Sequence, residues 1–73
     1  MDTTSEIMMR ILEDLYSGEG DGSATITAEY SKYYDSLDLD QSKEVVSGAI
    51  KRLLSENSNT KCEFGDDKFT LTA

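Results

Sequence analysis

The fold is decided by residues 41–57, QSKEVVSGAIKRLLSEN. Apolar residues recur in this segment at i, i+1, i+4, i+5, i+8 and i+9, which places them in one stripe along an α-helix. The stripe consists of Val45, Val46, Ala49, Ile50, Leu53 and Leu54. Asp40 precedes the segment as its expected N-cap, and asparagines at 57 and 59 mark its expected end. The pattern predicts a helix that packs through this stripe against a core.

A second apolar stripe near the start of the chain predicts another helix, over about residues 4–16. Thr3 and Glu6 have capping-box spacing. The stripe consists of Ile7, Met8, Ile11, Leu12 and Leu15. Met9 and Tyr16 fall beside the stripe, where they fit either the edge of the core or a contact with a second copy of the chain.

The segment between these helices begins with a glycine-rich loop, Ser17 to Ser23. Two acidic residues, and the lack of the Lys and hydroxyl residue that end a P-loop, argue against phosphate binding there. Ala24 to Thr27 is predicted to be a short strand, and Ala28 to about Leu37 a further helix. Its core side would carry Tyr30, Tyr33, Tyr34 and Leu37. Leu37 and Leu39 are both expected to point inward.

After the central helix the apolar period changes from 3.6 to 2, which is typical of strands. Residues 61–64 and 68–72 alternate in this way around a turn that contains Gly65. The pattern predicts a β-hairpin with a buried face formed by Cys62, Phe64, Phe69 and Leu71. Cys62 is interpreted as a small core residue, because nothing near it in the sequence would lower the pKa of its thiol.

Composition restricts the chemistry. The 73 residues carry a net charge of −8, yet residues 41–62 hold four Lys or Arg against two Glu. With a single Cys and no His, the usual zinc ligands and the commonest general base are missing. The carboxylates are spread over loops and helix ends, so we expect no catalytic, cofactor or metal site and no enzyme. The chain lacks both a transmembrane-length apolar run and a signal-peptide pattern, which favours a cytoplasmic protein.

The element order resembles the winged-helix branch of the helix-turn-helix proteins. The resemblance is carried by VVSGAIKRLLSENSN, residues 45–59, and KCEFGDDKFTLT, residues 61–72. It implies one α+β domain over residues 1–73, with a three-helix core and a C-terminal hairpin, in the order helix-strand-helix-helix-strand-strand. In this family the central helix reads DNA bases and the hairpin tip, or wing, contacts phosphates. The corresponding helix positions are Gln41, Ser42, Lys43, Ser47, Lys51 and Arg52, and the wing tip is Gly65, Asp66, Asp67 and Lys68.

Two functions remain open at this stage. Asp66 and Asp67 stand where a phosphate contact would require cations, and the net charge repels nucleic acid at long range. We therefore favour a small acidic, non-enzymatic module that binds a protein partner, by analogy with phage or mobile-element inhibitors of nucleic-acid-handling proteins. The alternative is a DNA-binding transcription regulator that uses residues 41–57 as its recognition helix and dimerises through Met9 and Tyr16. Neither function calls for a membrane or a small-molecule cofactor.

Overall fold

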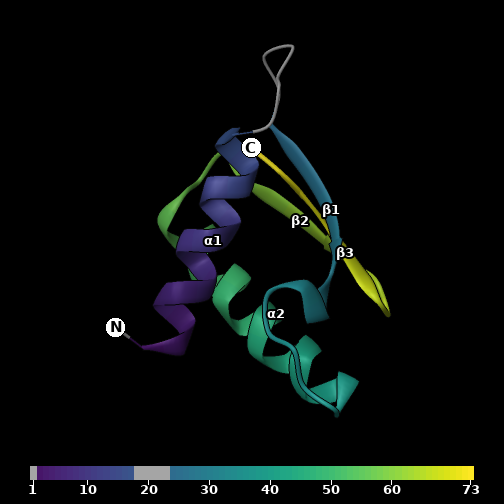
Figure 1. The fold of residues 1–73 in the computed structure, drawn as a ribbon. Helices are drawn as coiled ribbons and strands as arrows, with labels where there is room; N and C mark the ends of the chain where they lie inside the picture. The colour runs from purple at the N-terminus through teal and green to yellow at the C-terminus, as the bar shows by residue number, and fades with distance from the viewer. Residues whose placement is uncertain (1, 18–23) are drawn as a thin grey trace.

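The computed structural model describes residues 2–17 and 24–73 and has an α+β fold (Figure 1). Two α-helices and a 3₁₀ turn accompany a three-stranded antiparallel sheet. The elements are α1 (Thr3–Ser17), β1 (Thr25–Glu29), η1 (Tyr30–Lys32), α2 (Leu39–Glu56), β2 (Lys61–Phe64) and β3 (Lys68–Thr72). The predicted α+β class, first helix, central helix and hairpin are confirmed. The predicted glycine-rich loop falls on residues 18–23, outside the described residues, apart from Ser17, which ends α1.

The sheet has the strand order β1-β3-β2, so the hairpin is completed by a strand from much earlier in the chain. β1 pairs with β3 along five residues, from Thr25 opposite Thr72 to Glu29 opposite Lys68. The predicted boundary between strand and helix at Ala28 is therefore wrong. Ala28 lies opposite Phe69 and is buried, because pairing with β3 outweighs its preference for a helix.

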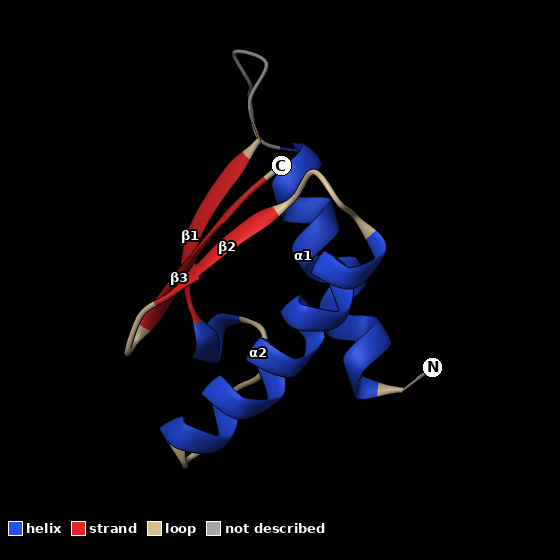
Figure 2. Cartoon of the chain, turned by 180° about the vertical axis from the view of Figure 1, so that it is seen from behind, coloured by secondary structure: helices blue, strands red, loops and turns tan. Residues whose placement is uncertain are grey.

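Both α-helices lie on one side of the sheet (Figure 2). The core between them consists of Ile7, Ile11, Leu15, Ala28, Tyr30, Tyr33, Val46, Ala49, Ile50, Leu53, Phe69 and Leu71. Phe69 joins the layers, because its ring centroid lies 5.5 Å from that of Tyr30 and 5.9 Å from that of Tyr33. The apolar stripes of the two helices thus meet the inward face of the sheet, as their spacing predicts.

The predicted middle helix is replaced by the single 3₁₀ turn η1. Tyr30 and Tyr33 are both buried, because a spacing of three places side chains on the same side of a 3₁₀ turn as well as of an α-helix. The expectation that Leu37 and Leu39 point inward is wrong. Leu37 is fully exposed and Leu39 is 67% exposed. Two α-helices and a turn thus take the place of the three-helix core.

The N-cap of α2 lies two residues earlier than predicted, and that of α1 one residue earlier. The Asp38 side chain accepts a hydrogen bond from the Asp40 backbone N–H, so Asp38 rather than Asp40 caps α2. At α1, the Asp2 carboxylate accepts from the Ser5 N–H at 2.7 Å and replaces the predicted Thr3 cap. This backbone hydrogen bond lowers the pKa of Asp2. Helix α2 ends at Glu56, followed by Asn57 in an extended conformation rather than a left-handed one.

Replacing Asp38 with alanine is expected to lower the free energy of unfolding by about 1 kcal/mol, the usual contribution of an N-cap side chain. Asp40→Ala is the matched control, because Asp40 lies in the first turn and contributes only its charge to the helix dipole, about 0.5 kcal/mol. Urea unfolding followed by circular dichroism measures both effects. A larger loss in Asp40→Ala than in Asp38→Ala would contradict the observed cap.

The inner face of the hairpin is only partly buried, although the alternation of apolar and polar residues predicts that the whole face is buried. Phe69 and Leu71 are fully buried, whereas Cys62 is half-buried and Phe64 is 39% exposed. Phe64 lies opposite Phe69 in the last pair before the turn of the hairpin. Within the described residues no helix is long and apolar enough to cross a membrane.

Candidate binding surface

The six α2 residues expected to read DNA do not form one free surface. Ser42 is completely buried, and its Oγ has no hydrogen-bond partner among the described residues. Gln41 is exposed, and its Oε1 accepts a hydrogen bond from the Ser36 hydroxyl at 3.1 Å. Ser47 is half-buried and lies close enough to the Tyr30 phenol to influence its pKa. Gln41 and Ser47 are therefore exposed to different degrees, whereas Ser42 is buried.

The three cations of α2 each have a neighbour within the chain. The Lys43 Nζ lies 5.9 Å from the centroid of the Tyr30 ring, and the Lys51 Nζ lies 5.9 Å from that of Phe64. Both lysines thus lean towards aromatic rings, whose faces attract cations. Arg52 instead pairs with Glu56 one turn on, with 3.4 Å between Nε and Oε2. This surface ion pair is weak, but it places a carboxylate beside the third cation.

The predicted wing tip is held against η1 by Tyr30. The Tyr30 hydroxyl donates to the Gly65 carbonyl oxygen at 2.8 Å, and the Tyr30 N–H donates to the Asp67 carbonyl oxygen at 3.4 Å. The turn itself is tight, because a Cβ on Gly65 would lie 2.9 Å from the Lys68 carbonyl oxygen. Burial is the main cause of the raised pKa of Tyr30, so its hydroxyl remains a donor at neutral pH. The position of the two wing aspartates is thereby fixed relative to α2.

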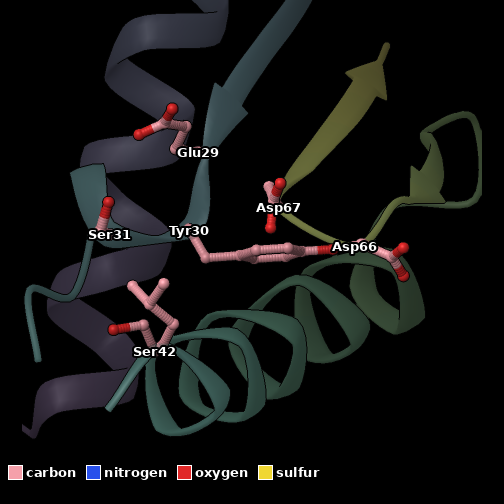
Figure 3. A pocket seen from close by; sticks show the side chains of 7 residues that line it. Glu29, Tyr30, Ser31, Ser42, Asp66 and Asp67 are labelled. Atoms are coloured by element: carbon pink, nitrogen blue, oxygen red, sulfur yellow. The ribbon is translucent and has the colours of Figure 1, made fainter. Parts of the chain in front are cut away.

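A surface hollow of about 270 Å³ lies between η1, the wing and the start of α2 (Figure 3). Its walls are formed by Glu29, Tyr30, Ser31, Leu39, Ser42, Asp66 and Asp67. In Figure 3 the Tyr30 ring extends across the site towards Asp66, with Asp67 above it and Glu29 at the upper left, on the opposite side from Asp66. A buried phenol ring and a leucine therefore line a hollow that three exposed carboxylates surround.

Two cations lie near these carboxylates and reduce their field. Lys68 is opposite Glu29 in the β1–β3 ladder, and Lys43 stands over the Tyr30 ring. Three further exposed aspartates lie close by in sequence, before α2 and in its first turn: Asp35, Asp38 and Asp40. Six carboxylates against two lysines give this region a net negative charge, which favours cationic groups over phosphates.

Sequence reasoning found only part of this surface. It singled out Ser42, Asp66 and Asp67, but it treated the aspartates as a defect in a DNA-binding wing. Glu29 and Leu39 are not among the expected site residues, because Glu29 falls within the helix predicted over residues 28–37 and Leu39 is expected to point inward. The exposed leucines within the run of alternating aspartates, SLDLD at 36–40, were the available signal.

The candidate dimer contact on α1 is exposed. Met9 is 49% exposed and Tyr16 is 65% exposed, so both side chains are accessible to a partner. The other side of α1 contacts η1, where the Arg10 guanidinium donates to the carbonyl oxygens of Lys32 and Tyr33 at 2.9 and 3.2 Å. The dimer contact stays a prediction.

The remaining reactive group is the Cys62 thiol, which is half-buried on β2. Burial, together with the nearby charge of Glu63, raises the pKa of Cys62 to about 11. Its thiol is therefore protonated at neutral pH, in keeping with its interpretation as a core residue. Among residues 2–17 and 24–73 no group of three or more His, Cys, Asp or Glu is arranged to hold a metal ion.

Comparison of the chain with protein-family models, with curated proteins and with solved structures found no match.

Proposed function

We propose that this chain is a non-enzymatic interaction module whose acidic surface binds a basic segment of a protein partner. The observation that carries the proposal is the hollow beside α2, where the carboxylates of Glu29, Asp66 and Asp67 lie around Tyr30 and Leu39. Charge complementarity of this kind steers a partner of opposite sign and suppresses partners of like sign. A protein that handles nucleic acid would present such a segment, because its binding surface is rich in Lys and Arg.

The arrangement of α2 supports a protein partner over DNA. A recognition helix needs exposed side chains that reach base edges together. Here Ser42 is buried, Lys43 and Lys51 lean on aromatic rings, and Arg52 has Glu56 beside it. The aspartates of the wing would also face the phosphates. The counterion release that dominates DNA affinity would therefore be small.

We also propose that the fold is a winged-helix-like variant in which η1 takes the place of the second helix. Two observations support this arrangement: α2 leads directly into the hairpin, and the strand order is β1-β3-β2. Under this proposal the scaffold is kept while the charge of its DNA-facing surface is reversed. Scaffold and function can be separated in this way because function depends on the site.

The proposal predicts binding to a basic peptide and none to duplex DNA. Fluorescence anisotropy at about 50 mM salt would compare a labelled Ser-Lys peptide with a mixed-sequence duplex. The expected result is peptide binding that weakens with salt, and that weakens about tenfold in the triple variant Glu29→Gln, Asp66→Asn, Asp67→Asn.

A second triple variant provides the matched control, because it removes the same charge from exposed carboxylates elsewhere: Glu6→Gln, Glu13→Gln and Glu63→Gln. Equal weakening in the two triple variants would mean that net charge alone attracts the peptide and would remove the hollow as the site. DNA binding that falls steeply with salt, and that Lys51→Gln abolishes, would overturn the proposal in favour of a DNA-binding regulator.

A further inference from the structure

Two exposed leucines lie just before and at the start of α2, one of them in the wall of the hollow. Leu37 is fully exposed and Leu39 is 67% exposed, and Leu39 also forms part of the wall of the hollow. Exposed apolar side chains are ordinary when they are scattered singly. Leu39 lines a concave, partly apolar site, and Leu37 lies two residues before it in the chain, so the pair offers exposed apolar surface beside that site.

The segment that carries the leucines is held in place by local hydrogen bonds. The Ser36 Oγ accepts from the Asp38 N–H at 3.2 Å and donates to the Gln41 Oε1 at 3.1 Å. The Asp38 carboxylate in turn accepts from the Asp40 N–H at 3.0 Å. The backbone that carries Leu37 and Leu39 is thus held in one conformation by hydrogen bonds within the chain, without a bound partner. Preorganisation reduces the entropy that binding would otherwise lose.

Acidic side chains lie around the leucines. Asp35, Asp38 and Asp40 alternate with them along the segment, and all three are exposed. The wall of the hollow adds Glu29, Asp66 and Asp67. The surface therefore combines an apolar centre with a negatively charged rim. Its complement is a surface in which apolar side chains are flanked by Lys or Arg.

We propose that Leu37 and Leu39 are the apolar anchors for an amphipathic basic helix of a partner protein, whose cations contact the carboxylates around the hollow. This inference rests on the proposed function and specifies its partner. The partner segment needs apolar residues at helical spacing in addition to its positive charge. Charge complementarity selects this occupant over a second copy of the chain, because a copy would bring six like carboxylates to the same contact.

The test uses two labelled peptides of about 14 residues, long enough for about four helical turns. One is an amphipathic peptide built only of Leu and Lys, and the other has every Leu replaced by Ser. The wild-type chain is expected to bind the Leu-Lys peptide at least about tenfold more tightly, as burial of two leucines would give. The double variant Leu37→Ser, Leu39→Ser is expected to lose this preference while it retains its affinity for the Ser-Lys peptide.

The matched control is Met9→Ser, Tyr16→Ser, which removes exposed apolar side chains from α1 and is expected to leave the preference unchanged. Unfolding in urea checks that both double variants are folded. Equal binding of the two peptides to the wild-type chain would overturn the inference and leave the proposed function intact. Loss of the preference in the α1 variant alone would overturn it by moving the apolar contact to α1. Failure of both peptides to bind would overturn the proposed function as well.

Discussion

Phe69→Ala is expected to leave the chain largely unfolded at 25 °C. Phe69 is completely buried and contacts both Tyr30 and Tyr33, so its ring connects the sheet with η1 and the helices. Removal of a buried phenylalanine side chain costs about 3–5 kcal/mol, which includes the cavity left behind. A single core in a domain of this size supplies about 3–5 kcal/mol of net stability. This one substitution therefore removes most or all of the net free energy of unfolding.

Phe64→Ala is the matched control for this prediction. Phe64 lies opposite Phe69 in the hairpin but is 39% exposed, so we expect a loss of about 1 kcal/mol or less. Circular dichroism at 25 °C, with urea titrations of both variants, compares them directly. A Phe69→Ala chain that unfolds cooperatively with more than about half of the wild-type stability would contradict the central place of this ring in the core.

The periodicity of apolar residues predicted α2 and β3 correctly, because in these elements the buried side chains are the ones that the apolar pattern marks. In α2 the residues Val46, Ala49, Ile50 and Leu53 are all buried, as the stripe requires. In β3 the alternation of Phe69 and Leu71 likewise matches burial. Both patterns depend only on residues close in sequence, which is why a single sequence is sufficient to find them.

The region between residues 28 and 40 could not be predicted for two physical reasons. The strand state of Ala28 and Glu29 depends on pairing with Phe69 and Lys68, about forty residues away, and local propensity does not report such a partner. The exposure of Leu37 and Leu39 also contradicts the usual rule for leucine. Local rules fail most often where a surface serves binding rather than stability, and these leucines adjoin the candidate site.

The free energy of unfolding is expected to fall as the pH rises above about 9, because groups that are buried in the folded chain ionise more easily in the unfolded one. The Cys62 thiol has its pKa raised from 9.0 to about 11. Burial raises the pKa of Tyr33 well above its ordinary value of 10.0, and its hydrogen bond to Asp14 adds to the shift. A raised pKa means that the folded state binds more protons than the unfolded state in this range. The stability that these two groups contribute is therefore fully present below about pH 9 and decreases as the pH rises above it.

Tyr33→Phe separates the tyrosine contribution from that of the thiol. The Tyr33 hydroxyl donates to the Asp14 carboxylate at 2.5 Å, so its removal is expected to lower stability at pH 7 by about 1.5–3 kcal/mol, the range for hydrogen bonds to charged groups. The same variant should lose less stability than the wild type between about pH 10 and 11, because position 33 no longer ionises in the unfolded state. Tyr16→Phe, a change at a side chain that is 65% exposed, should alter neither quantity appreciably.

Cys62→Ala measures the part of the stability loss at alkaline pH that comes from the thiol. Without the thiol, the fall in stability should begin nearer to pH 10 than to pH 9, since the tyrosines then ionise first. Urea titrations at about half-unit steps of pH give the slope for each variant. The differences between variants report the contributions of the substituted groups. The contrary result would be a Tyr33→Phe chain whose free energy of unfolding falls with pH above pH 10 as steeply as that of the wild type. It would show that the contact with Asp14 on α1 does not hold the Tyr33 hydroxyl in its protonated form.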